Sequence, residues 1–281
     1  MNNLRYKRRK IIQKIMFSFS VASAFIGIAF LFLILSYVIY KGAGGINIDF
    51  FTKLPTPVGV PGGGMANALI GSFYLVGLAS IFSIPVGILT GIYLSEFGRG
   101  LFASAVRFMA ETLTGVPSII IGIFAYSVVV ISMGRFSALA GAFALSLLML
   151  PIVAKSTEEI LKMVPENLRE ASLALGIPRW KTILKVVLST AKSGIITGIM
   201  LGIARVGGEA APLLFTAFGN SYMNWRPDQP MASLPVQLYV YAVSPYEDWH
   251  TKAWAAALVL IGIVLITNII ARIYAGNKQG Y

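Results

Sequence analysis

Long runs without a charged residue restrict the fold of this chain more than any other feature. Six such runs occur: between Lys14 and Lys41, inside the stretch from Lys53 to Glu96, between Glu111 and Arg135, between Arg135 and Lys155, after Lys192, and between Lys252 and Arg272. A helix needs about 20 apolar residues to cross the ~30 Å hydrocarbon core of a bilayer. The turn-forming segment "PTPVGVPGGG" precedes the second helix, which we therefore expect to begin near Met65. The runs predict an all-α, polytopic membrane protein with six transmembrane helices.

The composition agrees with this fold and removes whole classes of chemistry. Hydrophobic residues make up 57% of the 281 positions and charged residues 12%, whereas a soluble protein has about 25% charged residues. The chain has no cysteine and a single histidine, which excludes disulfides, thiolate metal sites and Cys–His nucleophilic pairs. The expected spans hold neither a nucleophile–base pair nor a pair of metal-binding carboxylates. We therefore expect neither enzymatic activity nor a bound metal.

The distribution of lysine and arginine predicts the orientation in the membrane. The basic "YKRRK" start imitates a signal peptide, but the apolar run after it is longer than a signal core, so we interpret it as an uncleaved first helix. With the amino terminus inside, the basic residues that fall outside are only Lys41, Lys53, Arg135, Arg205, Arg226 and Lys252, out of 23. This bias predicts that both termini are cytoplasmic. It also accounts for the net charge of +12 without a nucleic-acid partner.

The expected helices divide the chain into three parts. Residues 1–64 hold a cytoplasmic basic tail, the first transmembrane helix and an outer loop. Residues 65–275 form a core of five helices with a long cytoplasmic loop at 156–190, and residues 276–281 form a cytoplasmic tail. Apolar residues in the long loop recur at helical spacing between prolines and a glycine, so we expect short amphipathic helices there. Such helices either lie on the membrane surface or dock a cytoplasmic partner.

The loop segment "EASLALGIPRWKTILKVVLS" resembles the EAA loop of permease subunits of ATP-binding-cassette (ABC) importers. Glu170, Ala171 and Ser172 occupy the first triplet, with Ser in place of the third family residue, and Gly176 follows at the family's spacing. The resemblance implies that these residues form a helix and turn that couple to a cytoplasmic ABC ATPase dimer. The chain itself lacks the G-x-x-x-x-G-K-[ST] motif that holds ATP phosphates. We therefore expect it to bind no cofactor and to leave ATP and Mg²⁺ to the ATPase.

Two charges interrupt the apolar run of the fifth helix. Arg205 follows Lys192 by 13 residues, which at 1.5 Å per residue places it about 20 Å into the bilayer, past the midplane toward the outer side. Glu209 follows at i+4, on the same face of the expected helix. Glycines at four-residue spacing in "GIITGIMLGIARVGG" favour close helix packing. Either the two charges form a self-satisfied pair near the outer headgroups, or Arg205 faces a polar pathway and binds an oxyanion through its planar fork.

The segment "LGIARVGGEAAPLLFTAFGN", together with "ETLTGVPSIIIG" and "LPVQLYVYAVSP", resembles the PstA-type permeases of phosphate-specific ABC importers. This resemblance extends from about Met65 to the C-terminus. It implies a type I ABC importer permease core in a bacterial or archaeal plasma membrane. The implied partners are a homologous sister permease in a heterodimer and an extracytoplasmic phosphate-binding protein. By the same resemblance Arg205 is a phosphate-pathway residue that Glu209 supports.

Three further residues are candidates for the pathway. By the resemblance Lys155 is an inner station, and Glu158, three residues later on the same helix face, balances its charge. The alternative is that both only mark the membrane boundary. Ser118 stands at the start of the third helix, where its hydroxyl, like those of Thr112 and Thr114, either faces an anion or satisfies the helix N-terminus.

The inner segment before the third helix carries four charges, which we expect to form a solvated amphipathic face: Glu96, Arg99, Arg107 and Glu111. The favoured function of the whole chain is a permease subunit that brings inorganic phosphate into the cytoplasm on ATP hydrolysed by a partner. Charge alone does not separate phosphate from sulfate or molybdate, so a permease for another oxyanion is an alternative. An ATP-independent anion channel or secondary transporter is another, although it leaves the amphipathic loop without a partner.

Overall fold

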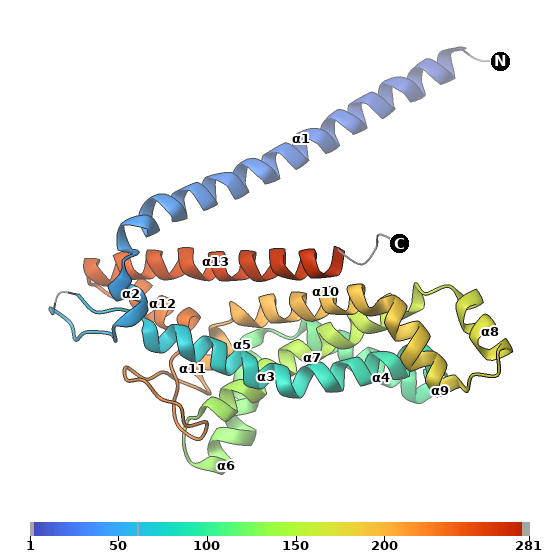
Figure 1. The fold of residues 1–281 in the computed structure, drawn as a ribbon. Coiled ribbons are helices and arrows are strands. Elements are labelled where there is room, and N and C mark those ends of the chain that lie inside the picture. Colours follow the sequence, from blue (N-terminus) through green and yellow to red (C-terminus); the bar gives the residue numbers. More distant parts are fainter. Residues whose placement is uncertain (1–2, 61, 277–281) are drawn as a thin grey trace.

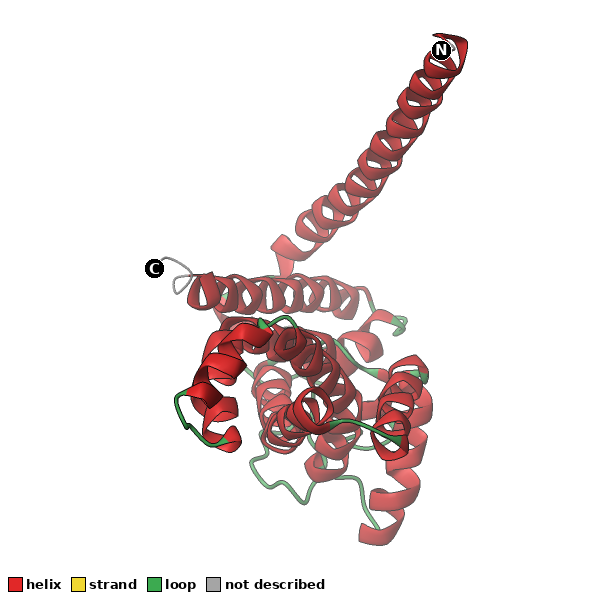
Figure 2. Cartoon of the chain, turned by 90° about the vertical axis from the view of Figure 1, so that its right-hand side faces the viewer, coloured by secondary structure: helices red, strands yellow, loops and turns green. Residues whose placement is uncertain are grey.

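The computed structural model describes residues 3–60 and 62–276, and this part of the chain consists of helices and loops without a strand (Figures 1 and 2). Its α-helices are α1 (Asn3–Gly42), α2 (Ile48–Thr52), α3 (Ala66–Ile92), α4 (Leu101–Gly115), α5 (Ser118–Ala125), α6 (Ile131–Met133), α7 (Ala138–Lys162), α8 (Glu166–Ala174), α9 (Arg179–Thr182), α10 (Leu188–Gly207), α11 (Ala211–Leu214), α12 (Leu234–Ala242) and α13 (Glu247–Gly276). The remaining helical turns are the 3-10 turn η1 (Ala43–Gly45) and the π turns η2 (Tyr93–Phe97), η3 (Tyr126–Val130) and η4 (Ile183–Val187). The expected C-terminal tail at 276–281 lies, after Gly276, outside the described residues.

The membrane-crossing helices follow the charge-free runs. The described helices long and apolar enough to span a bilayer are Tyr6–Gly45, Ala66–Phe97, Ala138–Lys162, Arg179–Gly207 and Glu247–Ile270. A sixth span results if the bent pair Leu101–Gly115 and Ser118–Met133 is counted as one. The second span begins at Ala66, with Met65 as its N-cap, where the turn-rich segment predicted it. The all-α polytopic fold is therefore confirmed.

The third span differs from the straight helix that its apolar run suggested. α4 and α5 meet at Val116 and Pro117, and their axes differ by 106°. Pro117 favours this bend because its ring disfavours a helical conformation at the preceding residue, and Val116 is extended at ψ 130°. The part after the bend, residues 118–133, is about 24 Å long, shorter than the ~30 Å hydrocarbon core.

The fifth span begins earlier than the run after Lys192 predicted. Pro178 is the N-cap of α9, and α9, η4 and α10 continue as one span to Gly207. Buried apolar side chains at four-residue spacing hold its first half in a cluster with the end of α7; they are Val187, Ala191 and Ile195. The cytoplasmic loop expected at 156–190 is therefore shorter, because α7 extends to Lys162 and only residues 163–178, with α8 among them, lie between the two spans.

Glycines allow the core helices to approach closely. Gly87 and Gly91 of α3 lie against Val153 and Thr157 of α7, and a Cβ added at either glycine would fall within 2.8 Å of a side-chain atom there. Small residues at four-residue spacing let helix backbones come together, so that dispersion contacts replace the missing side chains. α7 is thus the central helix, with α3 on one side and α10 on another.

α1 stands apart from this core and slants away from it (Figure 1). Only 6% of its most apolar window is buried, and it contacts α13 at one end, where Tyr37 and Trp254 meet edge to face with ring centroids 5.3 Å apart. The helix ends at Asn3 and Gly276 lie toward the side of the molecule that carries α8 (Figure 1). We call that side the α8 end, and the opposite side, which carries α12, the α12 end.

Candidate anion pathway and coupling region

The depth of Arg205 follows from the register between α10 and α7. The α10 glycines that face α7 are, each with its α7 neighbour, Gly194 (Ile160), Gly198 (Ser156) and Gly202 (Met149). The predicted close packing of these glycines is present. In the same antiparallel register Arg205, three residues beyond Gly202, is level with the middle of α7. It therefore lies nearer the middle of the spans than the count from Lys192 predicted, because the helix begins at Arg179.

Arg205 and Glu209 form the expected ion pair, but with a different local geometry. Nη2 of Arg205 lies 3.7 Å from Oε1 of Glu209, and the two side chains are 51% and 19% exposed. α10 ends at Gly207, so Glu209 stands beyond the helix rather than on its face, and its backbone N–H donates to Val206 O. A single long contact leaves guanidinium N–H groups free. Arg205 is thus able to bind an oxyanion through two parallel hydrogen bonds.

Arg205 lies on a face of α10 that the rest of the chain leaves uncovered. Thr197, Leu201 and Arg205 are all exposed and recur at four-residue spacing, whereas Gly198, Gly202 and Val206 beside them are buried. An exposed, charged residue in the middle of an apolar span requires either a second protein surface or water opposite it. The open face of α10 is therefore the part of this chain suited to line a polar pathway.

The pairing predicted at the α8 end of α7 is wrong in its partners. Glu158 does not balance Lys155: Oε1 of Glu158 is 2.7 Å from Nε of Arg107 and 2.6 Å from Nζ of Lys162, and its side chain is only 7% exposed. Lys155 lies 3.5 Å from Glu111 instead, and its side chain is 39% exposed. The two candidates therefore separate into a buried carboxylate held by two cations and a half-exposed lysine with a long contact.

The expected solvated face at the start of the third span is also wrong for two of its four members. Arg107 of α4 points inward, where it binds Glu158 and donates to Leu94 O and Gly98 O. The side chain of Glu96 is 6% exposed and lies 2.8 Å from Arg169 of α8. A sequence signal for Arg107 existed: it is spaced at i+4 and i−3 from Ala103 and Ala110, which are the buried residues of α4.

The candidate hydroxyls at the bend do not act as N-terminal caps. Thr112 and Thr114 belong to α4, and their hydroxyls donate back to Phe108 O and Ala110 O. Ser118 is the first residue of α5, is half-buried, and its hydroxyl makes no hydrogen bond within the described chain. Of these three residues, only Ser118 therefore has a hydroxyl that is not already engaged by the backbone.

α8 and the turn after it form a compact unit at the α8 end. Gly176 has φ +75°, Gly176 N donates to Leu173 O, and Ile177 N donates to Ser172 O, which is the Schellman arrangement that ends a helix. Ser172 is buried and shares a hydrogen bond of 2.9 Å with Thr182 of α9. Glu170 and Ala171 are exposed. The predicted helix and turn over the EAA-like residues are present.

The unit also presents apolar side chains outward. The exposed large apolar residues on and around it are Met163, Leu173, Leu175 and Trp180, with exposed fractions of 77%, 47%, 80% and 60%. They lie at the end of the molecule, beyond the last charged turn of α7 (Figure 1). Exposed apolar clusters of this kind are typical of protein interfaces.

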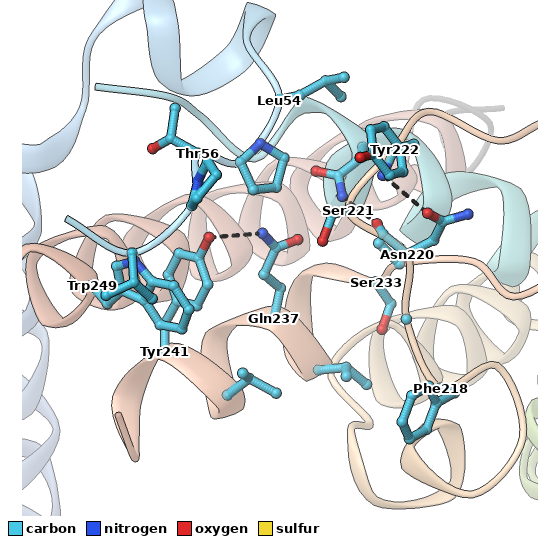
Figure 3. A pocket seen from close by; sticks show the side chains of 18 residues that line it. Leu54, Thr56, Phe218, Asn220, Ser221, Tyr222, Ser233, Gln237, Tyr241 and Trp249 are labelled. Carbon is cyan, nitrogen blue, oxygen red and sulfur yellow. Dashed lines mark hydrogen bonds between the residues drawn. The ribbon is translucent and has the colours of Figure 1, made fainter. Parts of the chain in front are cut away.

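A cavity of about 720 Å³ at the α12 end was not predicted from the sequence. It is formed by residues 54–58, 218–222, α12 and Trp249, and Figure 3 shows Gln237 donating to the Tyr241 hydroxyl inside it. Burial raises the pKa of the Tyr241 phenol, so this group is neutral at physiological pH. The described lining residues are all uncharged. The cavity therefore lacks the cation that an oxyanion site requires, and Arg205 is the better anion station.

These features describe a membrane subunit of a transporter: packed spans, an open face with an arginine at mid-depth, and an exposed helix–turn unit at one end. Residues 83–277 match the family described as "Binding-protein-dependent transport system inner membrane component". The chain belongs to this family.

Its curated relatives are close and match over their full length. The chain is 46% identical over 278 residues to the phosphate transport system permease protein PstA of Haemophilus influenzae, covering 99% of this chain and 98% of the relative. It is 42% identical over 275 residues to the protein of the same name in Yersinia pestis, covering 98% and 92%.

Solved structures support the fold. The chain superposes on a bacterial ABC transporter that imports the acidic polysaccharide alginate with a TM-score of 0.67 at 13% identity, covering 96% of this chain and 99% of that one. The MetNI methionine ABC transporter, in an inward-facing conformation, gives a TM-score of 0.59 at 19% identity, covering 76% and 93%. The fold is that of a type I ABC importer permease.

Proposed function

We propose that this chain is the permease subunit of an ATP-driven importer that brings inorganic phosphate into the cytoplasm. The observation that carries the proposal is Arg205, a half-exposed guanidinium level with the middle of the spans, on the open face of α10 and held by one long contact to Glu209. Phosphate as the substrate is supported by the full-length similarity to phosphate transport permeases. Bidentate binding of a tetrahedral oxyanion suits the planar fork of arginine.

The open face of α10 needs a second wall, which we assign to a sister permease in a heterodimer. The α8 end faces the cytoplasm, because the basic residues concentrate there, and both termini lie on that side. An extracytoplasmic binding protein delivers phosphate at the α12 end, and the complex lies in a bacterial or archaeal plasma membrane. Arg205 receives the anion midway, and Lys155, half-exposed nearer the cytoplasm, receives it next.

The exposed apolar unit around α8 docks the ATPase dimer, which binds ATP and Mg²⁺. Glu170 and Ala171 supply the polar and small part of the contact, and the turn at Gly176 sets the angle at which α9 leaves it. This chain supplies no ATP site and binds no cofactor. Its contribution is a path whose two sides move when the ATPase subunits close.

Transport measurements test the proposal. The chain is reconstituted in vesicles with its sister permease, ATPase and binding protein, and uptake of labelled phosphate is measured with and without ATP. Wild type should take up phosphate only with ATP, and sulfate or molybdate in tenfold excess should not compete. Arg205→Ala should lower uptake by about 100-fold, the loss of two charge-assisted hydrogen bonds, without loss of assembly.

Each alternative function has its own outcome in the same experiment. Uptake without ATP would mean a channel or secondary transporter. Full competition by sulfate or molybdate would mean a permease for another oxyanion. Phosphate uptake that Arg205→Ala leaves unchanged would remove Arg205 from the pathway.

The docking of the ATPase has a separate test. Gly176→Asp places a side chain in the left-handed conformation at the docking turn, whereas Gly134→Asp imposes a similar strain, φ +66°, at the end of α6. We expect the ATPase to be lost from Gly176→Asp and retained by Gly134→Asp in a pulldown from membranes. Retention by both variants would contradict the assignment of the docking turn.

A further inference from the structure

Three arginines from three different helices converge on the π turn η2 at the end of α3. Arg107 of α4 donates to Leu94 O at 2.7 Å and to Gly98 O at 3.3 Å. Arg179 of α9 donates to Glu96 O at 2.6 Å. Arg169 of α8 binds the Glu96 carboxylate at 2.8 Å.

The end of a helix leaves carbonyl groups without intrahelical partners, and the guanidiniums supply those partners here. A cap of this kind needs only one or two donors. The arrangement at η2 goes further, because the buried carboxylate of Glu96 and its own backbone carbonyl are held by two different helices of the docking unit. Arg179 also lies over the Phe97 ring, 4.9 Å from its centroid. η2 is therefore fastened to α8 and α9 rather than only capped.

Arg169 joins α8 to the end of α7 as well. Its Nη1 donates to Val164 O at 2.6 Å and its Nη2 to Leu161 O at 2.9 Å, while its side chain is only 13% exposed. One buried guanidinium on α8 thus contacts both α3, through Glu96, and α7. A buried ion pair resists separation because each charge left alone loses its compensation in a poorly solvated place.

α8 has a second, covalent connection to the membrane part, through α9 and η4 into α10, which carries Arg205. A displacement of α8 transmitted only along this route would move α10 and leave α3 and α7 behind. The Glu96–Arg169 pair gives α3 and α7 the same displacement. Because α10 packs on α7 through glycines, the two sides of the pathway would otherwise slide against each other.

We propose that Glu96 and Arg169 are positioning residues for transport: their ion pair transmits the movement of the docking unit to α3 and α7, so that ATP hydrolysis moves phosphate. This inference rests on the proposed function. It assigns no contact with phosphate or ATP to either residue. Its consequence is that breaking the pair uncouples hydrolysis from transport while the ATPase stays bound.

The test compares Glu96→Gln with Glu166→Gln in the complete reconstituted complex. Glu166 also contacts Arg169, at 3.3 Å, but its side chain is 71% exposed, so it is a matched control on the same arginine. Phosphate uptake and ATP hydrolysis are measured on the same vesicles, together with ATPase retention in a pulldown. We expect Glu96→Gln to lower the phosphate moved per ATP by about 5-fold or more, with the ATPase retained. Glu166→Gln should keep the wild-type ratio.

A double variant separates transmission from simple damage. Glu96→Gln with Arg169→Gln should lower the ratio no further than the more affected single variant, because both changes remove one link. A wild-type ratio in Glu96→Gln, loss of the ATPase from it, or additive losses in the double variant would each overturn the inference. Failure of the wild-type complex to take up phosphate would instead contradict the proposed function, since the ratio is defined only where wild type transports.

Discussion

Two clusters of charge lie at different depths of the same helix pair, and they are built in opposite ways. At mid-depth Arg205 has one partner at 3.7 Å and is half-exposed. Near the α8 end Glu158 has two partners at 2.6 and 2.7 Å and is 7% exposed. The loose pair leaves hydrogen-bond donors free for a passing anion. The tight cluster uses its capacity on the protein itself, so charge in a span is by itself no evidence of a binding site.

Removal of Glu158 should have the largest effect and should act on stability. Glu158→Ala leaves Arg107 without its carboxylate, and breaking a fully buried ion pair costs roughly 3–5 kcal/mol. Arg107 is partly exposed, so we expect a loss of about 2 kcal/mol in the free energy of unfolding. The measurement is equilibrium unfolding in mixed detergent micelles.

Lys162→Ala is the control for this prediction. Its side chain is 53% exposed although it touches the same oxygen, so the loss should stay below about 1 kcal/mol. Equal losses in the two variants would mean that the cluster is solvated and resembles the Arg205 pair. The contrast between the two depths would then disappear.

Exchange of Arg205 for lysine sharpens the other side of the comparison. Arg205→Lys keeps the charge but loses the planar fork, and with it one charge-assisted hydrogen bond to the anion. We expect phosphate uptake to fall by about 10-fold, less than for Arg205→Ala, with unchanged stability in micelles. Uptake at the wild-type rate would show that a point charge suffices at this depth.

Lys155 should show an intermediate behaviour, because it resembles Arg205 in exposure but lies beside the tight cluster. Its contact with Glu111 is long and both side chains are well exposed, so the pair adds little to stability. We expect Lys155→Ala to lower uptake by about 3-fold and to leave the unfolding free energy within ~0.5 kcal/mol of wild type. A loss of stability without a loss of uptake would make it a boundary residue only.

The sequence predicts features that depend on local spacing. Charge-free runs predict the spans because bilayer thickness fixes helix length, and the four-residue interval predicts that Arg205 and Glu209 meet. The bend at Pro117 also has a local cause, since proline restricts the residue before it. Its signal was present in the sequence, but the length of the apolar run outweighed it.

Partners far apart in the chain could not be predicted in this way. Arg107 reaches Glu158 across 51 positions and Arg169 reaches Glu96 across 73. No rule of spacing links such pairs, because they depend on how α4 and α8 are placed against α7. The cavity at the α12 end is similar, since three loops and helices from distant segments enclose it. A nearer signal existed only for Lys162, four residues after Glu158 on the same helix face.

The smallest expected effect decides what Glu209 does for Arg205. Either the carboxylate holds the guanidinium ready, or it competes with phosphate for the same N–H groups. The distance of 3.7 Å and the half-exposure of Arg205 correspond to a weak pair, of about 0.2–1 kcal/mol, so it exerts little hold on the guanidinium. Competition is therefore the stronger effect, and it promotes release of the anion. Glu209→Gln should lower the phosphate concentration for half-maximal uptake by about 2-fold and slow the maximal rate by a similar factor, because the anion leaves later. A rise in that concentration would mean instead that Glu209 holds Arg205 ready, and the loose pair would then share the structural role of the tight one.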